Sequence, residues 1–169
     1  MAIHKTAGTK FHISPTPVDY DAINAMTDED AIEFFEEISD WIEVEEIEEF
    51  GELGDTSEEI TFTAVGNRRV RKLKGPRNAG TQTLTVGRDP LDDGQEQLVA
   101  AEKTDFNYAL RLTLADARTP NHTDSVVYYA GLVMSRPTVL GNVSATTRRT
   151  FTVGINTGVY EVASELISS

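Results

Sequence analysis

The strongest indication of the fold is the stretch Thr81-Gln82-Thr83-Leu84-Thr85-Val86-Gly87-Arg88-Asp89-Pro90-Leu91-Asp92-Asp93-Gly94-Gln95-Glu96-Gln97-Leu98-Val99-Ala100-Ala101. Its threonine-rich start predicts a strand, the Gly-Arg-Asp-Pro that follows predicts a turn, and the remainder predicts a helix over about residues 93–103. Asp92 accepts hydrogen bonds from the first helical turn, Gln95 reaches back to the Asp92 amide, and Asp93 adds negative charge at the positive end of the helix dipole. The buried face of this helix is expected to comprise Leu91, Leu98 and Ala101.

Most of the chain outside this stretch carries the pattern of β-strands. Apolar and polar residues alternate with a period of two in the segments 40–48, 60–64, 107–114 and 147–155, which predicts half-buried strands at 60–64 and 107–114, and residues 159–162 are expected to form a short last strand. Residues 124–135 are apolar at successive positions, as in a strand covered on both faces. Several short strands with one helix indicate a mainly β fold, either a β-sandwich or a partly open barrel, with the helix packed across an end or edge.

The length fits a single domain. The 169 residues are 39% hydrophobic and contain no cysteine, so the chain can bury a core without disulfides, and thiolate metal sites are excluded. We expect an N-terminal arm over residues 1–18, with a possible short strand at 10–14 that Pro15 and Pro17 stop. Residues 19–169 then form one β domain.

The acidic segment 19–39 fits two conformations. Thr27 and Asp30 suit a capping box, and the apolar residues among the acids of 28–38 suit a short amphipathic helix. An extended conformation competes with that helix. The opening residues 1–8 lack an apolar run of the length of a signal peptide or a membrane span, so a soluble intracellular product is expected.

The formal net charge of −13 argues against a protein that grips nucleic acid. Phosphate binding draws its affinity from lysine and arginine, which release counterions. A conduit through which DNA slides would instead benefit from an acidic wall that repels the polymer. Solubility is a simpler explanation of the same acidic surface.

Charge is also segregated along the chain. Residues 28–59 contain many acids and neither lysine nor arginine, whereas a basic block follows almost at once. This basic block comprises Arg68, Arg69, Arg71, Lys72, Lys74 and Arg77. The two blocks either pair within one subunit, pair between copies and set the register of an assembly, or remain two solvated faces.

No catalytic or metal-binding pattern is found. The three histidines have no ligand-like spacing, and the stretch 89–100 fails as a calcium loop because Leu91 and Ala100 occupy positions that require oxygen ligands. We therefore expect no enzymatic activity, no cofactor and no metal.

In the order of its motifs the chain resembles the tail tube proteins of long-tailed bacteriophages with non-contractile tails, the siphophage tail tube family. Together the matches span about residues 40–165. The matching segments are Trp41-Ile42-Glu43-Val44 leading to Phe50-Gly51-Glu52-Leu53-Gly54, then Leu73-Lys74-Gly75-Pro76-Arg77-Asn78-Ala79-Gly80-Thr81-Gln82-Thr83-Leu84, then Asp89-Pro90-Leu91-Asp92-Asp93-Gly94-Gln95 with its helix, and Arg136-Pro137-Thr138-Val139-Leu140-Gly141.

The resemblance implies a virion structural protein. Six subunits would pair their inner sheets into one shared β-barrel, and the rings would stack into a tail tube that conducts DNA through an acidic lumen without binding it tightly. The implied channel strands are 40–49 and 68–86, and the implied contacts between rings are 1–17 and 51–59. Candidates for the lumen lining are Glu43, Glu45, Thr81, Thr83 and Thr85. Candidates for contacts between subunits or rings are Lys10, Phe11, Glu52, Asp55, Arg69, Arg71, Lys72, Glu96, Gln97 and Lys103.

The resemblance also implies partners and a location. The partners are other copies of the chain and the tape measure, terminator and baseplate proteins, with no membrane involved. The location is the virion tail, after assembly in the host cytoplasm. Three alternatives stay open: a tail terminator or head-to-tail joining protein, a ring protein of a secretion tube, and an acidic DNA mimic that binds a basic partner through residues 28–59.

Overall fold

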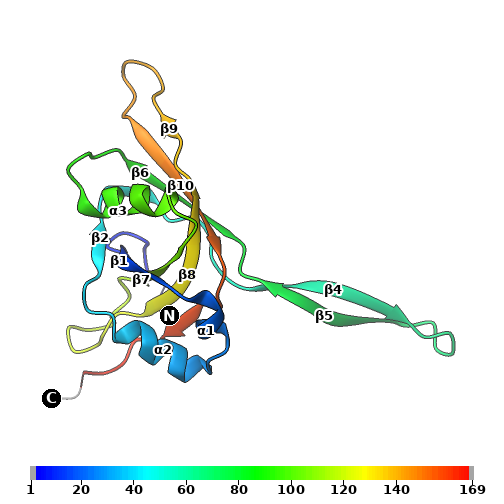
Figure 1. Cartoon of the computed structure of the whole chain (residues 1–169). Coiled ribbons are helices and arrows are strands. Elements are labelled where there is room, and N and C mark those ends of the chain that lie inside the picture. Colours follow the sequence, from blue (N-terminus) through cyan, green and yellow to red (C-terminus); the bar gives the residue numbers. More distant parts are fainter. Residues whose placement is uncertain (1–2, 168–169) are drawn as a thin grey trace.

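The computed structural model describes residues 3–167, which form a curved main sheet, three helices and a projecting two-stranded hairpin (Figure 1). The main sheet has the order β2-β1-β7-β8-β10-β6-β3, with β11 on β8 and β9 on β10, and the hairpin pairs β4 with β5. Its path ends at β2 and β3, so the sheet is open rather than a closed barrel. The strands are β1 Lys10–Val18, β2 Ile42–Val44, β3 Ile47–Glu49, β4 Thr56–Thr63, β5 Val70–Asn78, β6 Thr81–Gly87, β7 Asn107–Thr113, β8 Val126–Ser135, β9 Thr138–Val139, β10 Arg148–Ile155 and β11 Tyr160–Val162.

Helix α3 (Asp93–Glu102) covers the main core on one face of this sheet, which confirms the predicted mainly β fold and this helix. Leu98 and Ala101 are fully buried, as predicted. Leu91 is 88% exposed, so its predicted place in the buried face is wrong, because it lies in the turn before the helix begins. The core residues contributed by the sheet include Phe11, Leu84, Tyr129 and Phe151.

A second core lies on the opposite face of β7 and β8. Helices α1 (Tyr20–Asn24) and α2 (Asp28–Glu36) pack there, and the Phe35 ring stacks on Tyr128 with centroids 5.5 Å apart. Thr27 caps α2 by accepting from the Asp30 amide at 3.2 Å, so the helical alternative for this segment is confirmed. Within residues 3–167, α1 is the helix that was not predicted. Strand β8 is covered on both faces, as its apolar run predicts.

Strand β1 lies between β2 and β7, so the prediction of an arm over residues 1–18 is wrong for residues 10–18. Phe11 and Ile13 are fully buried. The prolines are tolerated because the register with β7 shifts between Ile13 and Pro17. There the Ser14 hydroxyl accepts from the Ala109 amide at 3.1 Å and takes the place of a ladder hydrogen bond.

Both predicted channel strands are divided in the structure. The segment 40–49 forms β2 and β3, because Glu46 between them has a left-handed φ of 60°. The segment 68–86 forms β5 in the hairpin and β6 in the main sheet, with Gly80 at φ 78° between them. The two halves of each segment therefore follow different directions in space.

Candidate assembly surfaces

One face of β6 and β10 is left uncovered by the helices and carries hydroxyl groups. Its neighbours across the ladder are Thr83 with Thr152 and Thr85 with Thr150, while the residues between them point into the core. We call this surface the threonine face; it comprises Thr81, Thr83, Thr85, Thr150 and Thr152. The structure thus brings the three predicted threonines together, and the alternation in 147–155 is the sequence signal for the other two.

Glu43 and Glu45 do not join this surface. Glu43 is in β2, at the far end of the strand order from β6, where it pairs with His12. The acid that does lie beside the threonine face is Glu49 in β3, which is exposed and pairs with Thr85. A lumen role for Glu43 and Glu45 remains a prediction.

The turn before α3 fixes β6 relative to the β2–β3 bend. Asp92 accepts from the amide of Gln95 at 3.1 Å, as predicted, and from the amide of Glu45 at 3.0 Å. The Gln95 side chain does not reach back to Asp92; it donates to the carbonyls of Gly87 and Glu45 and accepts from the Asp89 amide. One glutamine therefore ties three backbone segments together, a role that helix capping alone does not predict.

The hairpin of β4 and β5 extends away from the body and exposes apolar side chains. Ile60, Phe62, Val70 and Leu73 are between 46% and 57% exposed. The prediction that the strand at 60–64 is half-buried is therefore wrong, because the hairpin leaves the body and no layer covers either of its faces (Figure 1).

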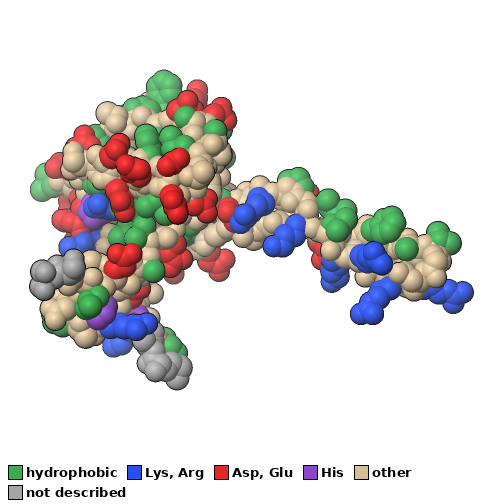
Figure 2. Space-filling model, turned by 90° about the horizontal axis from the view of Figure 1, so that it is seen from below, with side chains coloured by type: hydrophobic (Ala, Val, Ile, Leu, Met, Phe, Trp, Pro, Cys, Tyr) green, Lys and Arg blue, Asp and Glu red, His purple; other side chains and the backbone are tan. Residues whose placement is uncertain are grey.

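Charge separates the hairpin from the body. The basic block lies on the hairpin, whereas the face of the body shown in Figure 2 is dominated by acids. Two ion pairs join the blocks within the chain: Lys72 with Glu59 at 3.6 Å and Arg77 with Asp55 at 3.1 Å. The remaining basic residues of the hairpin, including the candidates Arg69 and Arg71, make no ion pair among residues 3–167.

The other predicted contact residues fall into three groups. Phe11 is fully buried in the main core, so its assignment to a contact surface is wrong. Gln97 holds α3 to β1 by donating to the carbonyls of Ser14 and Pro15. The exposed candidates that stay available for contacts are Lys10, Glu52, Glu96 and Lys103.

The described residues hold no group of three or more potential metal ligands. A hollow of about 720 Å³ lies between the hairpin base and α1, and it is lined mainly by polar groups such as Asn24, Arg77 and Asn156. Burial and the neighbouring Arg111 lower the pKa of His12, which pairs across the sheet with that arginine. None of these places joins a nucleophile to a base.

Comparisons with known proteins agree with this geometry. A family profile described as phage tail tube protein matches residues 6–162. No curated protein sequence matches the chain. Within residues 3–167, no helix has the length and apolar character needed to cross a membrane.

Three solved structures share the fold at low sequence identity. The first is a chain of the anti-feeding prophage baseplate, determined by cryo-EM with 6-fold symmetry, with a TM-score of 0.65 at 11% sequence identity. The alignment covers 96% of the present chain and 98% of the baseplate chain. A chain of an extracellular contractile injection system, from the structure of the PVC sheath/tube terminator in its extended state, has a TM-score of 0.60 at 11% identity, with 96% of the present chain and all of the other aligned. The SPP1 tail tube protein has a TM-score of 0.59 at 14% identity, with 94% of the present chain and 77% of the other aligned.

Proposed function

Because the chain belongs to the phage tail tube protein family, whose role is structural, we propose that six copies form a ring and that rings stack into the tube of a long, non-contractile phage tail. DNA passes through this tube during ejection. Support for a six-membered ring comes from the anti-feeding prophage baseplate, a structure with 6-fold symmetry, and support for stacking from the SPP1 tail tube. The protein acts as a building block, without enzymatic activity.

The observation that carries the proposal is the exposed hairpin. A two-stranded hairpin is marginally stable alone, and exposed apolar patches in soluble proteins mark interaction sites. Ile60, Phe62 and Leu73 would leave water if the hairpin lay on another copy. Its arginines and lysines would then meet the acidic residues 28–59 of that copy, which fixes the register between rings.

The threonine face lines the channel in this proposal. Its hydroxyl groups are uncharged and Glu49 lies at its border. Arg148, which shares this face of β10 with Thr150, is paired with Glu48, so the surface offers DNA phosphates no unpaired cation with which to exchange counterions. The DNA therefore slides rather than binds. Glu43 and Glu45 contribute to the negative field from outside this face.

The ring closes through the edges of the main sheet. Strand β3 pairs with β6 on one side, and its other side has no strand partner among residues 3–167. An unpaired edge recruits a strand from another copy, and closing the ring removes every such edge. Dilute isolated subunits are expected to be monomeric until an initiator or a high protein concentration brings the edges together.

The proposed role in a tube implies the partners of the protein. The tape measure protein fills the channel during assembly in the host cytoplasm, the baseplate starts the tube, and a terminator stops it. The acidic DNA mimic is set aside, because the family role is structural.

A terminator is the second candidate function, since the chain matches the full length of a chain from the PVC sheath/tube terminator structure. A terminator stops after one ring, whereas a tube protein stacks without limit. The length of the assembled particle therefore separates the two functions.

The test is negative-stain electron microscopy of the concentrated protein across salt and temperature. Phe62→Asp on the hairpin is expected to abolish stacking, and Val143→Asp, on the exposed loop between β9 and β10, serves as the matched control that still stacks. Tubes of normal length from the Phe62→Asp variant would contradict the role of the hairpin. A wild-type protein that forms neither rings nor tubes would contradict the function itself.

A further inference from the structure

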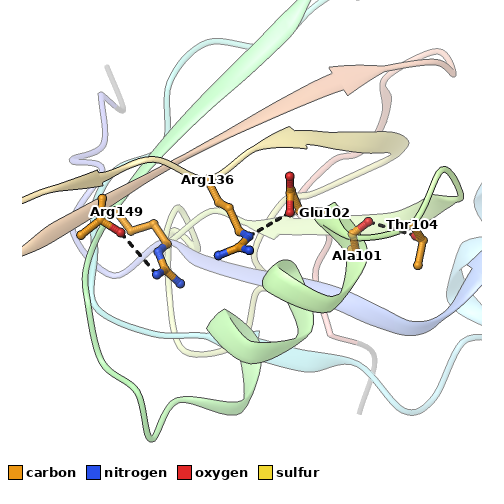
Figure 3. Close-up of polar contacts among 6 residues, drawn as sticks. Ala101, Glu102, Thr104, Arg136 and Arg149 are labelled. Atoms are coloured by element: carbon orange, nitrogen blue, oxygen red, sulfur yellow. Dashed lines mark hydrogen bonds and ion pairs between the residues drawn. The ribbon is translucent and has the colours of Figure 1, made fainter.

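Three arginines gather where β6, β8 and β10 run past the main core. Arg88 directly follows β6. Arg136 directly follows β8, and Arg149 lies in β10 opposite Val86; Figure 3 shows these two arginines. We call Arg88, Arg136 and Arg149 the arginine cluster. The three lie close enough to one another that, besides burial, repulsion from Arg88 and Arg136 lowers the pKa of Arg149.

The cluster has too few acceptors for its donors. Arg136 donates from Nε to Glu102 at 2.8 Å, whereas neither Arg88 nor Arg149 has a carboxylate within ion-pair distance among residues 3–167. Arg149 donates from Nη2 to the Thr138 hydroxyl at 3.3 Å, and its Nε is buried without an acceptor. A buried donor without a hydrogen-bond partner destabilises the fold, so we expect the arginine cluster to bind an anion.

The direction in which the side chains point indicates which class of anion the cluster binds. Arg149 alternates with Thr150 along β10, so it shares the face of Phe151, and Arg88 shares the face of Val86. This is the core side of the sheet, opposite to the threonine face. DNA in the proposed channel would lie on the other side, so the anion belongs to a protein.

We propose that the arginine cluster binds carboxylates of a second copy of this chain, supplied by its acidic stretch 28–59. The proposal rests on the self-assembly described above. That stretch contains no lysine or arginine, so it has an excess of carboxylates to offer, and the planar guanidinium fork binds a carboxylate through two hydrogen bonds. The cluster is then a second contact between copies, distinct from the hairpin.

The first test compares two double variants with the same change in net charge. Arg88→Gln with Arg149→Gln removes the unpaired arginines, while Arg118→Gln with Arg148→Gln removes an exposed loop arginine and the arginine paired with Glu48. The critical concentration for assembly, measured by sedimentation, is expected to rise about tenfold or more in the first variant and less than about twofold in the control. The first variant should also lose part of the salt dependence.

The single variant Arg88→Gln controls for misfolding, since Arg88 is exposed and has no ion pair among residues 3–167. It should raise the critical concentration several-fold with unchanged thermal unfolding. Assembly of both Arg88 variants at the wild-type concentration would overturn the inference while leaving the proposed function intact. Failure of the wild type to assemble would instead overturn the function, and the inference with it.

A second test identifies which residues bind to the arginine cluster. Arg88→Lys introduces a primary amine that a carbodiimide couples to a carboxylate in direct contact. Mass spectrometry of assembled particles should find the coupling to residues 28–59 of another copy. Coupling elsewhere, no coupling in assembled particles, or selective loss of binding to a DNA oligonucleotide with assembly unchanged would each contradict the inference.

Discussion

Strands with the same alternating pattern are buried in the body and exposed in the hairpin. In β7 the residues 107–110 are all buried, because α3 and the main core lie on one side and α1 and α2 on the other. In β4 every residue from 58 to 63 is exposed. Alternation thus specifies a strand but not what covers it, and a covering layer missing from one copy points to another copy.

The largest loss of stability is expected from a substitution in the body, at a place where two backbone segments are in direct contact. A Cβ on Gly94 would lie 2.1 Å from the Glu43 carbonyl oxygen and 2.5 Å from the Val44 Cα. Gly94→Ala should therefore force α3 away from β2 and destabilise the fold by about 3 kcal/mol, measured by chemical unfolding. Gly66→Ala, in the hairpin loop where a Cβ meets nothing within 4 Å, should change the free energy of unfolding by less than about 0.5 kcal/mol. Equal effects at both sites would remove the contrast between the two regions.

The next largest loss of stability is expected from replacing a buried polar side chain in the body. The fully buried Gln82 accepts from the Tyr129 hydroxyl and donates to the Phe50 carbonyl at 2.8 Å. Gln82→Leu leaves both groups without a partner and should cost about 2–3 kcal/mol in thermal or chemical unfolding. Thr83→Val, one residue along on the threonine face, is the control and should cost little. A stable Gln82→Leu protein would mean that water replaces the glutamine.

A smaller effect is expected from pH. His12 has a pKa below its ordinary value of 6.5, first because of burial and then because of Arg111, so its neutral form is favoured in the folded state. As pH falls below 6.5, the unfolded chain takes up a proton before the folded chain does, and stability decreases until the folded-state pKa is passed. Other charged groups facing His12 are Glu43 and Lys10.

The measurement is the urea midpoint between pH 7.5 and 5.5, above the range where most carboxylates titrate. The midpoint of the wild type should fall with pH, and that of His12→Gln should fall less. Parallel curves for the two proteins would assign the pH dependence to other groups.

The smallest effect is expected in the hairpin. Lys72 and Glu59 are both more than half exposed and 3.6 Å apart. Lys72→Ala should change the stability of the isolated subunit by less than about 0.5 kcal/mol. A large loss of subunit stability would show that the hairpin supports the body after all.

Much of the main sheet could be predicted from sequence, because local patterns determine it. The threonine alternation from Thr81, the cap at Asp92 and the apolar run in 124–135 each specify their own element. The position of β1 could not be predicted, since Pro15 and Pro17 argue against a central strand and only the bulge with Ser14 makes them compatible with one.

The candidate site was predictable in part. The sequence separated an acidic block from a basic one, but it predicted a half-buried strand at 60–64 and one channel strand over 68–86 instead of an exposed hairpin, because alternation does not specify which layer covers a strand. Arg88, Arg136 and Arg149 are far apart in sequence, so only the register of β6, β8 and β10 brings them together.

Cryo-EM of the concentrated wild-type chain tests the central claim most directly. The account predicts a hollow tube of stacked rings in which each hairpin lies on the acidic body of a copy in the next ring and the threonine face lines the channel. Particles that remain monomeric under every condition, or rings whose hairpins project into solvent, would contradict it.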